Sequence, residues 1–179
     1  MKVLGISGSL RSDSHNTALL RNAPVELELW EDLRSIPPYD EDDDVEPAPP
    51  AVARMRATVA GADAILFSTP EYNGSVPGQL KNAIDWLSRP RATSVLRNKP
   101  VAVVSASTGM FGAVWAQAEL RKVLAAAGAR VIENGVAVGR AHERFDVDGA
   151  LTDDELLAQL GDVVETLIFE SAPAVLVAA

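Results

Sequence analysis

The sequence contains no cysteine, and only 5% of its residues are aromatic. Without cysteine, the chain cannot form disulfide scaffolds, thiolate metal sites, CxxC redox motifs or cysteine nucleophiles. Any redox chemistry must therefore come from a bound cofactor. Since 47% of the residues are apolar and few of these are aromatic, we expect a core of Ala, Val, Leu and Ile, typical of layered α/β proteins.

Basic residues and long apolar runs are also scarce. The 16 Lys and Arg against 25 Asp and Glu give a net charge of −9, which argues against a nucleic-acid binder, because such proteins neutralise phosphates. The N-terminal MKVLGISGSL holds only a short apolar run and lacks the layout of a signal peptide. We therefore expect a cytoplasmic protein with neither a nucleic-acid nor a membrane partner. The length suits one domain, residues 1–179.

Strand-like apolar runs alternate with helical segments along the chain. This alternation predicts a doubly wound parallel α/β sheet with helices on both faces and ligands beyond the carboxyl ends of the strands. VELELW alternates polar and apolar residues, as an edge strand does. The expected strands are 2–7, 25–30, 62–68, 99–107 and 129–138, and the expected helices are 16–23, 50–61, 77–88, 113–128 and 152–170.

Several local signals complete this outline. Thr152 is the expected N-cap of the last helix, and Gly61 and Gly128 occupy C-cap positions. The segment 36–50, rich in proline and acidic residues, is interpreted as a solvated connection rather than an acidic docking surface. The apolar end, 172–179, is expected to dock on the body or on another subunit.

The loop after the first strand, SGSLRSDSHNT, combines hydroxyls, a glycine and one arginine. Arg11 can give forked hydrogen bonds to a phosphate, and Ser9, Ser14 and Thr17 add hydroxyl donors. An ordinary loop with a Ser or Asn N-cap explains the composition equally well. The sequence has neither a P-loop nor GxGxxG here, so a single phosphate fits better than a pyrophosphate. His15 is interpreted as a partly exposed loop residue, not a ligand or base.

Two further loops follow the third and fourth strands. In TPEYNGSVPG, turn formation explains Asn-Gly and Pro but leaves Glu71 and Tyr72 unexplained; with Asn73, these side chains can meet a flat heteroaromatic ring. The loop at 105–112 offers main-chain N–H groups that can stabilise the negative charge of a reduced ring. Each loop alone fits an ordinary helix entry, but three at one edge of the sheet favour a shared ligand. No metal site is predicted.

Four motifs together resemble the NADPH-dependent FMN reductase family, the flavodoxin-like group that includes bacterial chromate, quinone and azo-dye reductases. They are GSLRxxSxN at 8–16, TPEYNGSVPGxLKNAIDW at 69–86, STGMFG at 107–112 and HERFDVDGALTD at 142–153. The resemblance implies a flavodoxin-like three-layer sandwich with a five-stranded parallel sheet in the order 2-1-3-4-5.

The resemblance also implies a role for each matched position. The phosphate of FMN would be held by Ser9, Arg11, Ser14, Asn16 and Thr17; the isoalloxazine would be lined by Pro70, Glu71, Tyr72 and Asn73; and the site would be closed by Ser107, Thr108, Gly109 and Phe111. The helix Gln79–Ser88 would contact a second subunit in a homodimer or homotetramer, with Lys81, Asn82, Asp85 and Trp86 as candidates, although an intramolecular core explains Trp86 equally well. Two features depart from the family: the first helix is short, and Asp13 would oppose an anion if it pointed inward.

The function expected from these residues is hydride transfer from NADPH or NADH through FMN to a small acceptor such as a quinone, flavin, chromate or azo compound. The flavin carries the chemistry, so no catalytic side chain is required. Two alternatives stay open at this point. One is a flavodoxin-type electron carrier that does not oxidise NAD(P)H directly, and the other is a fold relative without FMN that acts as a binding or scaffold protein.

Overall fold

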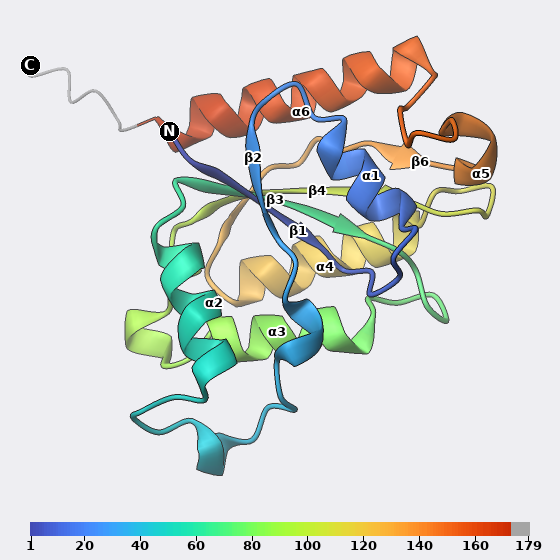
Figure 1. Cartoon of the computed structure of the whole chain (residues 1–179). Helices are drawn as coiled ribbons and strands as arrows, with labels where there is room; N and C mark the ends of the chain where they lie inside the picture. The colour runs from blue at the N-terminus through green and yellow to red at the C-terminus, as the bar shows by residue number, and fades with distance from the viewer. Residues whose placement is uncertain (173–179) are drawn as a thin grey trace, which may run out of the picture.

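A twisted parallel sheet crosses the centre of the molecule, with helices on both sides (Figure 1). The computed structural model describes residues 1–172, so the apolar end lies outside the described residues from 173 onward. All paired strands are parallel, and their order is β2-β1-β3-β4-β5, with β6 also pairing to β4. The predicted flavodoxin-like order is therefore confirmed.

The central strands are buried on both faces, as their continuous apolar runs predict. Every residue of β1, β3 and β4 is buried, whereas the edge strand β2 is only partly covered. Helices α2, α3 and α4 cover one face, and α1 and α6 cover the other (Figure 1). The strands are β1 Val3–Ser7, β2 Leu27–Trp30, β3 Ala64–Thr69, β4 Pro100–Ala106, β5 Arg130–Val131 and β6 Ala137–Val138.

The helices lie close to the predicted ranges. The first helix has only 7 residues, as short as the sequence indicated. The α-helices are α1 His15–Arg21, α2 Pro50–Ala60, α3 Gly78–Leu87, α4 Val114–Ala126, α5 Ala141–Arg144 and α6 Asp154–Ser171, and the 3-10 turns are η1 Leu33–Ser35, η2 Glu41–Asp43 and η3 Arg91–Thr93.

The fifth strand is broken into β5 and β6, which the sequence did not predict. Both halves stay beside β4. Between them, the Arg121 guanidinium of α4 donates to the Val103 carbonyl at 3.3 Å. Gly135 lies so close to this pair that an added Cβ would sit 2.6 Å from the Val103 oxygen. Because a side chain bonds the carbonyl that a continuous strand would use, the strand pairing is interrupted there.

The last helix begins one residue later than predicted. Asp153, not Thr152, is the N-cap, and its carboxylate accepts from the N–H groups of Glu155 and Leu156. Thr152 instead donates its hydroxyl to the Arg144 carbonyl. A carboxylate at the N-cap also complements the helix dipole, which favours Asp153 over the neighbouring threonine.

The acidic segment 36–50 is mostly exposed, as expected of a solvated connection, but it is anchored at two points that the sequence did not reveal. Ile36 is buried, and the Pro37 carbonyl accepts from the Trp86 indole at 2.9 Å. Further along, Asp44 and Arg56 form a largely buried ion pair at 2.8 Å.

These contacts also correct the expected subunit interface. Trp86 is fully buried within its own chain, and the Asn82 amide bonds Pro37 and Tyr39. The Trp86 side chain is therefore not available to a second subunit, whereas Asn82 stays partly exposed. Lys81 and Asp85 remain half-exposed and pair with each other at 2.7 Å.

Candidate functional site

Three loops meet beyond the carboxyl ends of β1, β3 and β4 and enclose a cavity of about 140 Å³. They are the loops 8–14, 70–77 and 107–113. The first two touch at Gly8, where an added Cβ would lie 3.4 Å from the Pro70 ring. The parallel topology thus gathers the polar loops singled out in the sequence at one edge of the sheet.

The first loop is shaped by its own hydroxyls. The Ser14 hydroxyl is the N-cap of α1 and accepts from the N–H groups of Asn16 and Thr17 at 3.2 and 3.3 Å. The Ser9 hydroxyl accepts from the Arg11 N–H at 3.3 Å. The Arg11 side chain forms no hydrogen bond or ion pair with any residue in the described range 1–172, so its guanidinium can bind a ligand.

Asn16 has a structural task inside the sheet. Its amide donates to the Ala106 carbonyl at 2.9 Å and accepts from the Ala106 N–H at 3.0 Å and the Ser68 hydroxyl at 2.8 Å. The side chain is buried and joins α1 to the ends of β3 and β4. It therefore holds the floor of the cavity together.

The second loop contains a tight turn at Tyr72–Ser75. The N–H and carbonyl groups of Tyr72 and Ser75 bond one another at 3.0 and 3.1 Å, and Asn73 and Gly74 both have positive φ, 54° and 74°. Two successive positive φ angles define a type I′ turn, for which Asn-Gly is the preferred pair. The turn leaves the Tyr72 side chain 50% exposed beside the cavity.

Glu71 has a role that the sequence did not reveal. Its carboxylate accepts from the Ala116 N–H at 3.1 Å, within the first turn of α4. The N-cap position of that helix is Ala113, which has no side-chain acceptor to offer. Glu71 therefore caps the helix from another loop and satisfies one of its free N–H groups.

The third loop is clamped against the chain that follows β6. An added Cβ on Gly139 would lie 2.1 Å from the Met110 carbonyl oxygen, so only glycine permits this approach. The Gly109 carbonyl accepts from the Arg140 N–H at 2.9 Å. Beyond the clamp, Phe111 and Trp115 form an edge-to-face pair with ring centres 5.3 Å apart, and both are more than half exposed.

The cavity brings together most of the predicted site. Of the predicted binding residues, those that line it are Ser9, Arg11, Ser14, Asn16, Pro70, Glu71, Tyr72, Ser107 and Thr108. Those outside its lining are Thr17, Asn73, Gly109 and Phe111. Thr17 borders a neighbouring cavity of about 400 Å³, which also reaches Ser9 and Arg11.

His15 lines the same cavity, although the sequence interpretation set it aside. Burial, the Arg11 charge and His142 together lower its pKa from the ordinary value of 6.5. The sequence did contain one indication that His15 belongs to the site, because it lies between the motif residues Ser14 and Asn16. Within residues 1–172, no group of three His, Asp or Glu side chains is arranged to bind a metal ion.

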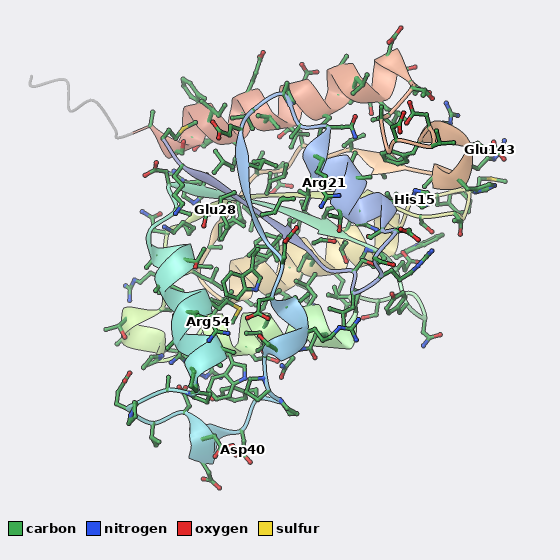
Figure 2. All side chains as sticks on the ribbon, viewed as in Figure 1. His15, Arg21, Glu28, Asp40, Arg54 and Glu143 are labelled. Carbon is green, nitrogen blue, oxygen red and sulfur yellow. The ribbon has the colours of Figure 1, made fainter. Side chains whose placement is uncertain are left out.

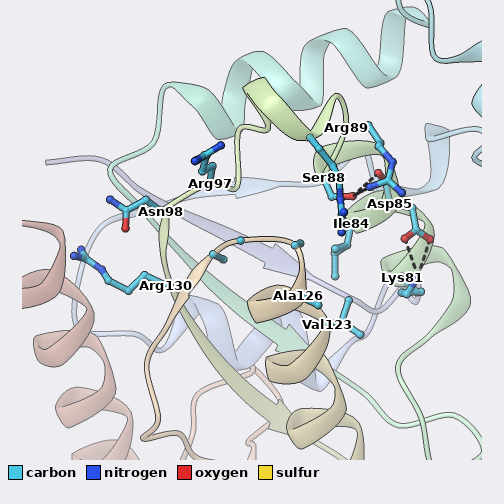
Figure 3. A pocket seen from close by; sticks show the side chains of 14 residues that line it. Lys81, Ile84, Asp85, Ser88, Arg89, Arg97, Asn98, Val123, Ala126 and Arg130 are labelled. Atoms are coloured by element: carbon cyan, nitrogen blue, oxygen red, sulfur yellow. Dashed lines mark hydrogen bonds and ion pairs between the residues drawn. The ribbon is translucent and has the colours of Figure 1, made fainter.

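A larger groove, about 840 Å³, lies at the opposite edge of the sheet (Figure 3). It runs between the C-terminal ends of α3 and α4, with Ile84, Val123 and Ala126 among its apolar lining. Its cationic side chains are Lys81, Arg89, Arg91, Arg97 and Arg130. None of the residues predicted from the sequence to bind the flavin lies in this groove.

Comparison with known proteins accounts for the arrangement of the loops. Residues 1–143 match the model of a family described as NADPH-dependent FMN reductase. The chain belongs to this family. A member from Pseudomonas aeruginosa, named NAD(P)H-dependent FMN reductase PA1204, is 45% identical over 162 residues, which are 87% of this chain and 86% of that protein. A quinone reductase from Pseudomonas putida is 41% identical over 154 residues, covering 83% of each chain.

A solved structure agrees with the match to the FMN reductase family. FerB, a flavoenzyme NAD(P)H:(acceptor) oxidoreductase from Paracoccus denitrificans, superimposes with a TM-score of 0.84 at 34% identity, covering 95% of this chain and 96% of FerB. The predicted family and enzyme class are therefore confirmed. Membership in an oxidoreductase family favours the enzyme over the electron-carrier and scaffold alternatives. No helix within the described residues is both long and apolar enough to span a membrane.

Proposed function

We propose that this protein oxidises NADPH or NADH and passes the electrons, through bound FMN, to a quinone, a flavin, chromate, an azo compound or a similar small acceptor. The observation that carries the proposal is the cavity where residues of all three predicted loops meet. The names of the relatives, an FMN reductase and a quinone reductase, point to the same class of acceptor.

The phosphate of FMN fits the donor set of the first loop. Arg11 supplies a forked cation without an internal partner among the described residues, and the hydroxyls of Ser9 and Ser14 border the same cavity. The predicted contribution of Asn16 is indirect, since its amide is already bonded to β3 and β4. Thr17 would act from the neighbouring cavity, where its hydroxyl bonds Ser7 at 3.0 Å.

The rest of the flavin would lie outside the enclosed cavity. A volume of about 140 Å³ is below the roughly 300–1,000 Å³ typical of a complete small-molecule site, but it is sufficient for the phosphate end. The flat ring would meet the exposed surfaces of Tyr72 and Phe111, with Asn73 and Gly109 beside them. Bound FMN supplies hydride chemistry, and the residues around it bind and orient the reactants.

The exposed aromatic surface favours planar acceptors. Tyr72 and Phe111, on the second and third loops, and Trp115, in the first turn of α4, are each at least half exposed. Aromatic side chains stack with flat rings in offset or edge-to-face contacts. A quinone or a second flavin matches this surface better than a flexible aliphatic substrate does.

We also propose a homodimer or homotetramer that includes the exposed face of α3. Lys81 and Asp85 stay half-exposed there and border the 840 Å³ groove with its apolar lining (Figure 3). Sedimentation velocity of the purified protein, with a Lys81→Glu variant that reverses a charge on the exposed face of α3 as the comparison, tests this contact. A monomeric wild type, or a variant that associates as the wild type does, would remove α3 from the interface. The cytoplasmic location stays a prediction, which cell fractionation would check.

The experiment for the main proposal is a visible absorption spectrum of the protein loaded with FMN and desalted, then mixed anaerobically with NADPH or NADH. We expect flavin bands that are retained and that bleach on mixing, followed by recovery when a quinone is added. Retained bands that do not bleach would contradict direct oxidation of NAD(P)H. Loss of all flavin on desalting would contradict a resident FMN.

A further inference from the structure

We propose that His15 is a further phosphate-facing residue of the flavin pocket and takes up a proton when the phosphate of FMN binds. This inference deepens the proposed function and rests on it. It adds a titrating side chain to a site that the sequence assigned to Arg11, hydroxyl groups and an amide.

The first support is the position of the ring. His15 opens α1, directly after the cap Ser14, and its side chain lines the 140 Å³ cavity together with Arg11 and Ser9. Figure 2 shows it at the end of the molecule that also carries Glu143 of α5. An imidazole at this wall can donate an N–H to an anion in the cavity when it is protonated.

The second support is that the ring is held in place. His15 stacks on Phe145, with ring centres 5.4 Å apart and planes inclined by 24°. Phe145 is itself fixed, because it pairs with Leu151 and donates its N–H to the Ala141 carbonyl at 3.2 Å. The stacking on Phe145 therefore restrains the imidazole beside the cavity.

The third support is the balance of charges around the ring. Arg11 on its own loop and His142 on α5 both disfavour its protonated form, and so does partial burial, so the pKa of His15 lies below its ordinary value. Three acids on the surrounding elements are bonded to other groups or exposed to solvent. Glu143 pairs with His142 at 3.4 Å, Glu71 caps α4, and Asp13 is exposed.

A phosphate in this cavity would supply the missing negative charge. An anion close to an imidazole favours the charged form and raises its pKa, so a proton from solvent moves onto His15 as the phosphate enters. Binding coupled to proton uptake strengthens as the pH falls through the pKa values of the bound and empty states. A rise of about one pKa unit corresponds to about tenfold tighter binding below both values.

The ligand has an opposing pH dependence that the experiment must separate. A phosphate monoester loses its second proton near pH ~6, so its own charge weakens as the pH falls. His15→Phe keeps an aromatic ring on Phe145 and removes the titrating nitrogens. The ratio of the FMN dissociation constants of variant and wild type therefore isolates the imidazole, and we expect it to approach one at pH 8.5 and to rise as the pH falls, towards about tenfold below both pKa values.

Proton NMR of the two histidines gives a readout independent of activity. The His142→Gln variant leaves His15 as the only imidazole, so its titration is unambiguous. We expect its pKa to rise on addition of FMN or of inorganic phosphate, and to stay in place on addition of riboflavin, which lacks the phosphate. Calorimetry in two buffers of different ionisation enthalpy should show proton uptake for FMN in the wild type and less in His15→Phe.

The outcomes keep this inference apart from the proposed function. If FMN binds and bleaches with NADPH while the His15 titration does not move, the inference fails and the function stands. An equal shift with riboflavin would assign the effect to the ring system and overturn the phosphate contact. If FMN does not bind, the proposed function fails, and titration with inorganic phosphate still decides whether His15 faces an anion.

Discussion

The two edges of the sheet hold cavities of opposite character. At the carboxyl edge, a small cavity of about 140 Å³ is lined by hydroxyls, Arg11 and His15 from three loops. At the amino edge, a groove of about 840 Å³ is lined mainly by helix ends and cationic side chains (Figure 3). Cations close to the C-termini of helices complement the helix dipole, so this groove can be basic without binding an anion. Cavity size alone would thus point to a different edge from the one that carries the predicted flavin-binding residues.

The largest expected effect concerns the floor of the carboxyl-edge cavity. Asn16→Ala removes three buried hydrogen bonds and leaves groups of Ser68 and Ala106 unpaired. We expect the free energy of unfolding to fall by about 2–4 kcal/mol, measured by urea denaturation. Asn98→Gly at the amino edge is the control, because glycine accepts the φ of 57° found there. Similar losses for both variants would show that Asn16 does not tie the strands together.

The next effect tests which edge binds FMN. Arg11→Ala should lose a charge-assisted contact of about 1.5–3 kcal/mol, which raises the FMN dissociation constant about 10- to 150-fold. Arg91→Ala removes a cation from the amino-edge groove and should leave the constant unchanged. Fluorescence titration of FMN measures both. A larger effect of Arg91→Ala would move the flavin site to the other edge.

A smaller effect is expected for the helix cap contributed by the second loop. Glu71→Ala should remove the acceptor for the Ala116 N–H and destabilise the protein by about 0.5–2 kcal/mol. Glu71→Gln keeps an acceptor oxygen and should lose less. Thermal unfolding of both variants measures this, with Glu119→Ala on the exposed side of α4 as the matched control. Equal melting temperatures for all of these variants and the wild type would show that the Glu71 carboxylate does not stabilise α4, and its predicted contact with the flavin would be its only role.

The sequence was informative where local chemistry and topology agree. The apolar runs predicted the buried strands β1, β3 and β4, and the strand order followed from the family motifs. The pair Asn73-Gly74 also predicted a turn, because its preference for positive φ depends only on these two residues.

The features that were missed depend on contacts between distant segments. The break in the fifth strand comes from Arg121 on another element, and the burial of Trp86 comes from the Pro37 segment. The cap formed by Glu71 on α4 joins residues 45 positions apart. No periodicity or motif in one segment shows which distant side chain will bond it.

The smallest expected effect concerns His15 at the carboxyl-edge cavity. Since the folded protein lowers the pKa of His15 below 6.5, the unfolded chain binds this proton more readily, and stability falls as the pH drops below about 6.5, until the folded pKa is passed. His15→Phe has no such group and should lack this part of the decline. Urea denaturation of both proteins between pH 5.5 and 8, without ligand, measures the difference. Addition of inorganic phosphate should reduce this loss of stability in the wild type, because an anion beside His15 favours the protonated imidazole in the folded protein. If stability falls equally in both proteins, the loss belongs to other titrating groups.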